Sequence, residues 1–331
     1  MTDARVAVVT GASGGVGRAT AREFARRGFD VAVLARGNAG LVAAEREVVQ
    51  EGRRALALEV DVADADVVDA AAARVEAALG PIDVWVNNAM ATIFSPFADM
   101  DPADFRRAVD VTFLGQVWGT RAALRRMRPR DRGTVVNIGS ALAFIGIPLQ
   151  SPYCAAKFAC RGFFNAVRTE LLHDGSKVRV CMVDLPAVNT PQFEWGKNLM
   201  ARRPQPVPPI YQPEFAARSI VRVALTGRRA KILGSWNRVL VLATTLSPAF
   251  ANHYAALGAW ESQLTNDPAP DDSPSNLHAP VDRERDFGAH GRFGDRAGGF
   301  RDPTFLRTLP TNASQGARAL VQTLTEKVGR T

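Results

Sequence analysis

The chain has 331 residues, of which 47% are hydrophobic and 22% charged, and its formal net charge is +8. This content supports a sizeable core, in one large domain with an appendage or in two small domains, and excludes global disorder. The 3 cysteines lack metal-ligand spacing and the 4 histidines are scattered, so we expect no metal site. The N-terminus enters an apolar run without the features of a signal peptide, which predicts a cytoplasmic protein.

The basic charge is densest in the arginine-rich stretch 121–132, at the end of a segment with helical periodicity. Aromatic residues for base stacking do not interleave with these arginines, and no nucleic-acid motif accompanies them. Arginines in the last turn of a helix also complement its dipole. The pattern therefore favours a solvated helix end over a nucleic-acid surface.

Short apolar runs alternate with segments of helical periodicity from residue 5 to about residue 235. The runs cover 6–10, 31–35, 55–60, 84–89, 134–140 and 178–185, and the helical segments cover 15–27, 40–51, 64–79, 103–127 and 152–173. Nearly continuous apolar runs are typical of strands that are buried on both faces of a parallel sheet. The alternation predicts an α/β fold with a doubly wound, Rossmann-type sheet of about seven strands, including a short edge strand near 231–234.

The alternation of apolar runs and helical segments ends near residue 236. We assign 1–235 to a dinucleotide-binding and catalytic domain and 236–331 to its C-terminal extension. Residues 239–260 carry no charged side chain, but a proline and two polar residues interrupt them. This favours a packed helical pair or a pocket or oligomer wall over a membrane-surface element. A linker rich in proline, aspartate and serine follows at 266–276, then a tail rich in glycine and charge, with a short helix near 314–328.

A glycine-rich turn, TGASGGVG at 10–17, joins the first predicted strand to the first predicted helix. Glycines permit a tight turn, and the backbone N–H groups at a helix N-terminus bind a pyrophosphate. The position of this turn after the first buried strand predicts a dinucleotide site. Its residues are Gly11, Ser13, Gly15, Val16 and Gly17.

The second predicted strand ends at Arg36, where an NAD-selective site would place a carboxylate for the ribose 2′-hydroxyl. A cation instead suits the 2′-phosphate of NADP. Arg36 therefore favours NADP(H) as the preferred cofactor, with NAD(H) as the alternative.

Tyr153 and Lys157 lie four residues apart in a predicted helix that Ser151 can cap and Pro152 can begin. Residues at this spacing share one face of a helix. Such pairs are common on ordinary amphipathic helices, so the pair acquires meaning only together with other motifs.

The loop at 10–17, Asn87-Asn88-Ala89, Ser140 and Tyr153-x-x-x-Lys157 occur in the order and at the distances of the short-chain dehydrogenase/reductase family. The chain resembles the single-domain form of that family over residues 4–235. The resemblance implies that Tyr153 is the general acid/base and that Ser140 binds the substrate oxygen. It also implies that Lys157 favours the tyrosinate and holds the nicotinamide ribose.

The same resemblance implies further cofactor contacts: Asp61 and Val62 with the adenine, Asn88 and Ala89 with the ribose, and Pro186 and Thr190 with the nicotinamide. Three positions depart from the family pattern. Met90 and Ala187 each replace a usual glycine, and Thr112 replaces an asparagine that holds a proton-relaying water. We expect Thr112 to keep a weakened or rerouted relay, because a hydroxyl lacks the two donors of an amide.

The predicted substrate walls are mostly apolar, which suits a hydrophobic ketone, aldehyde or alcohol. They comprise Met90, Leu142, Phe144, Ile145, Ile147, Phe193 and Trp195, with Phe94 and Phe97 as further candidates; core packing is the alternative for each. Residues 187–213, rich in proline and arginine, resemble a substrate loop that orders on binding, and a plain surface loop is the alternative. Arg202 and Arg203 in that loop leave an acidic or acyl-carrier-linked substrate open.

Together these features predict an NADP(H)-dependent oxidoreductase for a small hydrophobic carbonyl or alcohol, with no metal and no nucleic-acid partner. The alternatives are a dinucleotide-binding regulatory protein with little turnover and a membrane-surface protein of the same fold. By resemblance, the segments 103–127 and 152–173 form the interface of a homodimer or homotetramer, with Phe158, Phe163, Phe164 and Val167 as its apolar surface.

Overall fold

The computed structural model describes residues 4–298. The helix predicted near 314–328 lies outside the described residues.

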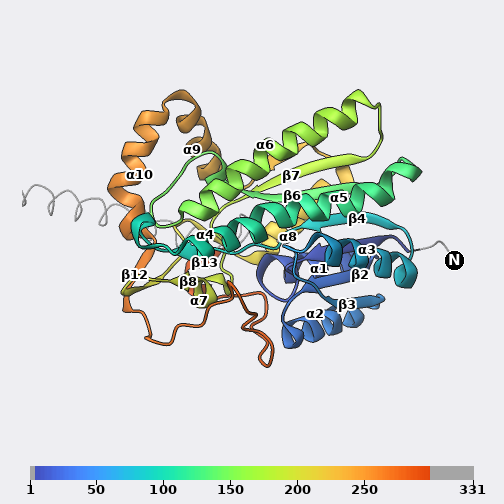
Figure 1. Ribbon diagram of the computed structural model, residues 1–331, viewed down its shortest axis with the longest axis horizontal. Coiled ribbons are helices and arrows are strands. Elements are labelled where there is room, and N and C mark those ends of the chain that lie inside the picture. The colour runs from blue at the N-terminus through green and yellow to red at the C-terminus, as the bar shows by residue number, and fades with distance from the viewer. Residues whose placement is uncertain (1–3, 299–331) are drawn as a thin grey trace, which may run out of the picture.

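Seven strands form the central sheet: β1 (Val6–Thr10), β2 (Asp30–Ala35), β3 (Ala55–Glu59), β4 (Ile82–Asn87), β6 (Thr134–Ser140), β7 (Arg179–Leu185) and β11 (Ala230–Ile232). They lie in the order β11-β7-β6-β4-β1-β2-β3, and every neighbouring pair is parallel (Figure 1). The order reverses direction at β1, which is the topological switch point where such folds bind ligands. The predicted doubly wound sheet, including its short edge strand, is confirmed.

Helices cover both faces of the sheet, and each face has its own apolar core. One face carries α1 (Gly15–Arg26), α2 (Asn38–Gln50) and α8 (Pro213–Thr226), the last of which is absent from the sequence prediction. The other carries α3 (Ala65–Leu79), α4 (Pro102–Val109), α5 (Gly115–Met127) and α6 (Ser151–His173). A π-helical turn, Asp110–Leu114, joins α4 to α5. Short 3-10 turns cover Phe97–Asp99, Arg128–Arg130, Ala141–Ala143 and Gly294–Arg296.

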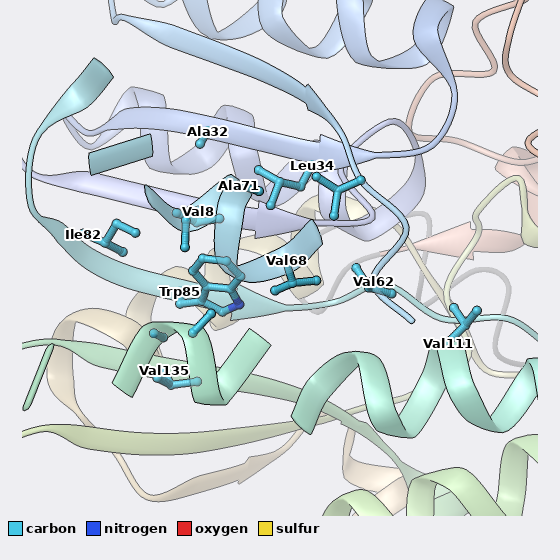
Figure 2. Packing of buried hydrophobic residues seen from close by; sticks show 14 of the residues in the cluster. Val8, Ala32, Leu34, Val62, Val68, Ala71, Ile82, Trp85, Val111 and Val135 are labelled. Atoms are coloured by element: carbon cyan, nitrogen blue, oxygen red, sulfur yellow. The ribbon is translucent and has the colours of Figure 1, made fainter. Parts of the chain in front are cut away.

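Trp85 is the largest fully buried side chain of the central strands. Figure 2 shows it among apolar side chains that include Val8, Val68 and Val135. Its indole N–H donates to Asn87 Oδ1 at 2.7 Å, so its one polar atom is satisfied. This dry packing fixes the strands, and thereby the loops at their carboxyl ends, where the predicted site residues lie.

The segment between β7 and α8 holds short elements in place of a single loop. They are α7 (Gln192–Trp195), β8 (Lys197–Asn198), β9 (Arg202–Pro204) and β10 (Ile210–Tyr211). The three strands pair with β5 (Ile93–Phe94), β12 (Leu264–Pro268) and β13 (Ala297–Gly298), respectively. Two of these partners belong to the C-terminal extension, which is therefore joined to the segment between β7 and α8 by backbone pairing.

The extension begins with a helical pair, α9 (Ser235–Leu246) and α10 (Pro248–Ser262), at the carboxyl end of the sheet (Figure 1). Within residues 4–298, no helix combines the length and apolar character needed to cross a membrane.

Several local expectations can be compared with the structure. Gln150, and not Ser151, precedes the first turn of α6, so the predicted Ser151 cap is wrong. On the same helix, Phe164 is buried, Phe163 meets Phe113 edge-on and Phe158 is exposed. Association of copies through these helices stays a prediction.

The arginines at the end of α5 pair with carboxylates of neighbouring elements. The pairs are Arg126–Asp69, Arg130–Glu76, Arg128–Asp174 and Arg132–Asp83, with N–O distances of 2.6 to 3.0 Å. The local positive charge is thus compensated within the chain.

Candidate active site

One cavity of about 1220 Å³ extends along the carboxyl ends of the strands. Twenty of the predicted site residues line it: Gly11, Ser13, Gly15, Val16, Arg36, Asp61, Val62, Asn88, Ala89, Met90, Ser140, Leu142, Ile145, Ile147, Tyr153, Lys157, Pro186, Thr190, Phe193 and Trp195. Gly17, Thr112 and Phe144 are not among its lining residues in the described part of the chain. The cavity therefore joins the glycine-rich loop and the Tyr-Lys pair in one space.

Hydrogen bonds from the neighbouring strand hold the glycine-rich loop. Thr10 Oγ1 accepts from the backbone N–H groups of Asn88 and Ala89 at 2.9 and 3.1 Å, and Asn88 Nδ2 donates to the Thr10 carbonyl at 2.9 Å. Gly11 has a φ of +63°, and a Cβ on Gly17 would collide with the Gly11 carbonyl. Two positions of the loop thus require glycine, and the resulting close turn fits a dinucleotide pyrophosphate.

Ser140, Tyr153 and Lys157 come together from β6 and the first turns of α6. The Ser140 side chain hydrogen-bonds Tyr153 and also accepts from the Leu142 N–H at 3.1 Å. Lys157 Nζ donates to the Ile138 carbonyl at 2.7 Å and lies 5.4 Å from the centre of the Tyr153 ring. The backbone of β6 thus fixes the lysine beside the tyrosine.

Burial dominates the acid–base behaviour of this pair. It raises the pKa of Tyr153, which the hydrogen bond from Ser140 opposes, and it lowers the pKa of Lys157. A protonated tyrosine can donate its proton to a carbonyl oxygen, and a nearby lysine cation favours the tyrosinate that remains. The arrangement therefore suits proton exchange with a substrate oxygen.

Thr112 lies behind the cavity in the π-helical turn. Its hydroxyl donates to the Ala91 carbonyl and accepts from the Ala91 N–H, both at 2.9 Å. The side chain is fully buried and holds the segment between β4 and β5, which carries Met90. A proton-relay role for Thr112 stays a prediction, and these contacts show what its hydroxyl does in the structure.

An apolar chamber adjoins the Ser-Tyr-Lys group. Leu142, Ile145 and Ile147 pack against Leu240 of α9 and Ala255 of α10. The predicted wall residue Phe144 instead stacks on Arg161, with the guanidinium 3.8 Å from the ring centre.

The remaining candidate wall residues lie elsewhere. Phe94 belongs to a separate buried cluster, and Phe97 is exposed. Arg202 pairs with Glu261 at 2.6 Å, and neither Arg202 nor Arg203 is among the described lining residues. The predicted positive charge for an acidic substrate is therefore not part of the cavity.

Sequence reasoning included a pocket wall among its interpretations of 239–260, but it did not assign the residues that the extension contributes to the cavity. Trp236 and Leu240 of α9 line the chamber, while Asn276 and Asp282 line the end near Arg36. Apolar residues at 239–260 were a usable signal for the chamber. The glycine- and charge-rich tail offered no comparable pattern.

Asp184 of β7 is a buried carboxylate that sequence reasoning also missed. It lies opposite Gly139 of β6, and its nearest basic group, Arg161, is 3.9 Å away. Burial raises the pKa of Asp184 to about 6, against the opposing effects of Arg161, Lys157 and the Ser140 backbone. The ionised carboxylate is thus costly to bury behind the active site.

We expect Asp184→Asn to raise the free energy of unfolding at pH 7. Because the folded-state pKa is above the unfolded value, wild-type stability should fall between about pH 4 and pH 6, by about 3 kcal/mol, and then level off. Denaturant titrations at several pH values should show this slope in the wild type and in an Asp99→Asn control, but not in Asp184→Asn. An unchanged slope in Asp184→Asn would contradict the prediction.

Comparisons with known proteins agree with this geometry. A family model described as short chain dehydrogenase matches residues 5–197. An uncharacterized oxidoreductase of Bacillus subtilis, YxnA, is 31% identical over 80% of this chain and 75% of its own length. A 3-ketodihydrosphingosine reductase of Bos taurus is 30% identical over 69% of this chain and 70% of its own. Among solved structures, a metagenomic short-chain oxidoreductase in complex with NADP has a TM-score of 0.58 and 29% identity, covering 69% of this chain and 95% of that one.

Proposed function

The chain belongs to the short-chain dehydrogenase/reductase family of oxidoreductases, and from that premise we propose that it uses NADP(H) to interconvert an apolar ketone or aldehyde and its alcohol. The observation that carries the proposal is the shared cavity, in which the glycine-rich loop, Ser140, Tyr153 and Lys157 face the same space. The bound nicotinamide supplies or accepts the hydride. Tyr153 exchanges the proton of the substrate oxygen, and Ser140 donates a hydrogen bond to that oxygen.

Arg36 supports the preference for NADP(H). It lies at the end of β2, next to the start of α2, and it lines the cavity. In dinucleotide folds the residue at this place meets the 2′ substituent of the adenosine ribose, where a cation attracts a phosphate. The related oxidoreductase that was solved with NADP adds support from outside the chain.

The apolar chamber supports a hydrophobic substrate. Its walls come from the segment after β6 and from α9 and α10, and they include the aliphatic side chains of Ile145, Ile147 and Leu240. A charged or sugar-like molecule would lose its hydration there without compensation. The relative from Bos taurus is named as a reductase of a 3-keto compound, which agrees with reduction of a ketone.

We expect kcat/KM to increase along a series of methyl ketones of growing chain length, with NADPH as the reductant. Each buried methylene contributes about 0.8 kcal/mol, so the gain should be about fourfold per carbon until the chamber is full. Loss of NADPH absorbance measures the rate.

Leu240→Ala should flatten this dependence, because it removes part of the chamber wall. Leu246→Ala, an exposed position at the end of the same helix, should leave it intact. Rates that do not depend on chain length, or that favour sugars or acids, would contradict the apolar assignment. Binding of the dinucleotide without turnover of any carbonyl would instead favour a regulatory role.

A further inference from the structure

The extension returns over the adenosine end of the cavity as a strap, residues 276–293. The backbone carbonyls of Asn276, Leu277 and His278 accept hydrogen bonds from the Arg36 guanidinium. The Leu277 side chain is fully buried in the apolar core on the face of the sheet that carries α3 and α5. The strap thus packs against Arg36, the residue that is expected to contact the 2′ substituent of the adenosine ribose.

The middle of the strap lies on the start of α2. The Asp282 carbonyl accepts from the Ala39 N–H at 3.1 Å. Farther along, Asp286 forms two hydrogen bonds with Arg18 of α1, at 2.5 and 3.0 Å, and the Gly288 carbonyl accepts from the Gly15 N–H at 3.2 Å. Anchors on both sides therefore hold residue 282 in place.

The Asp282 side chain is the unusual group of this segment. It is only 6% exposed, it lines the cavity, and its Oδ2 has no hydrogen-bond partner among the described residues. Oδ1 fills the place that a Cβ on Gly37 would take, and Gly37 directly follows Arg36. A buried carboxylate with one unpartnered oxygen is costly unless a ligand satisfies it.

We propose that Asp282 is a specificity-determining residue for the dinucleotide: its carboxylate accepts from the free ribose hydroxyls of NAD(H) and opposes the 2′-phosphate that Arg36 attracts. The inference rests on the proposed function of the same site. A carboxylate at the end of β2 is the usual partner of the ribose 2′-hydroxyl. Here the cation stands at that position, and the extension supplies the carboxylate from 246 residues farther along the chain.

Arg36 and Asp282 have opposite effects on the 2′-phosphate of NADP(H). Arg107, Asp61 and Asp282 all lie close enough to Arg36 to interact with it electrostatically, yet the acceptors of the guanidinium hydrogen bonds are uncharged carbonyls. The positive charge of Arg36 thus remains available to a phosphate, and the negative charge of Asp282 reduces its effect. The balance makes NADP(H) the preferred cofactor while NAD(H) remains usable.

The test is fluorescence titration of the full chain with NADPH and with NADH. Asp282→Asn should tighten NADPH binding by at least about tenfold and leave NADH binding unchanged or weaker, because like charges placed together are strongly unfavourable. Asp282→Ser provides a second, smaller replacement, and thermal melting confirms that each variant is folded. Glu284→Gln, which removes the same charge from an exposed site on the strap, should leave the ratio of the two dissociation constants unchanged.

An unchanged ratio in both folded Asp282 variants would overturn the inference while leaving the proposed function intact. An equal change of the ratio of dissociation constants in Glu284→Gln would also overturn it, because the effect would then come from the net charge of the protein and not from the position of Asp282. Failure of the wild type to bind either dinucleotide would overturn the proposed function and the inference with it.

Discussion

Tyr153→Phe should reduce kcat by about two to four orders of magnitude and leave the dissociation constant of NADPH unchanged. The substitution removes only the phenolic oxygen, which hydrogen-bonds Ser140, and keeps the ring that packs beside Lys157. Because the hydroxyl acts on the substrate oxygen during the reaction, its loss should fall on turnover and not on cofactor binding. Steady-state rates and a fluorescence titration separate the two effects.

Tyr211→Phe is the matched control, because it removes the same atom from another buried tyrosine. The Tyr211 ring stacks on Phe215 with a centroid distance of 4.9 Å, and that stacking persists in phenylalanine. The control should retain most of the wild-type rate. A Tyr153→Phe rate within tenfold of the wild type would show that another group exchanges the proton.

Gly17→Ala should weaken dinucleotide binding by roughly 10- to 100-fold, in line with the cost of about 1–3 kcal/mol for an added methyl group in a tightly packed region. The new Cβ would collide with the Gly11 carbonyl and lie 2.5 Å from Asn88 Nδ2. Because Asn88 also holds the Thr10 carbonyl, relief of the collision displaces the loop that shapes the pyrophosphate site. Titration with NADPH and with NADH should show the loss for both cofactors.

Gly162→Ala is the control for this second substitution. Gly162 lies in α6, and a Cβ there would meet no atom within 4 Å. It should bind both dinucleotides as the wild type does. Equal affinity in Gly17→Ala would mean that the close contact between the loop and the first turn of α1 is not needed for binding.

The sheet was predictable because its strands carry their signal in side chains. The runs at 6–10 and 134–140 coincide with β1 and β6, since strands buried on both faces must be apolar at almost every position. The glycine-rich loop and the Tyr-Lys pair were predictable for a related reason, since backbone geometry and chemistry restrict the residue types at those places.

The strap was not predictable, because backbone groups make many of its contacts. Carbonyls of residues 276–278 hold Arg36, and the Gly288 carbonyl accepts from Gly15. Every residue type carries a backbone carbonyl, so a hydrogen bond to that carbonyl requires no particular residue type and leaves no pattern in the sequence. The side-chain contact of Asp286 with Arg18 spans 268 positions, which no local pattern reveals.

Asp184 and Thr112 were hard to interpret for another reason. Asp184 follows a run of apolar residues in β7, and only the three-dimensional structure shows that it faces Gly139 beside the active site. Thr112 was interpreted from the family pattern alone, whereas the structure engages its hydroxyl with Ala91.

The strap follows every strand of the central sheet in the chain, so it is also synthesised after them. Translation begins at the N-terminus, and domains begin to fold as they leave the ribosome, so all seven strands of the sheet are available before residue 276 exists. In that interval the nascent chain presents Arg36 without the carboxylate of Asp282. From the role proposed for Asp282, we expect a chain that lacks the strap to favour NADP(H) over NAD(H) more strongly than the full chain does.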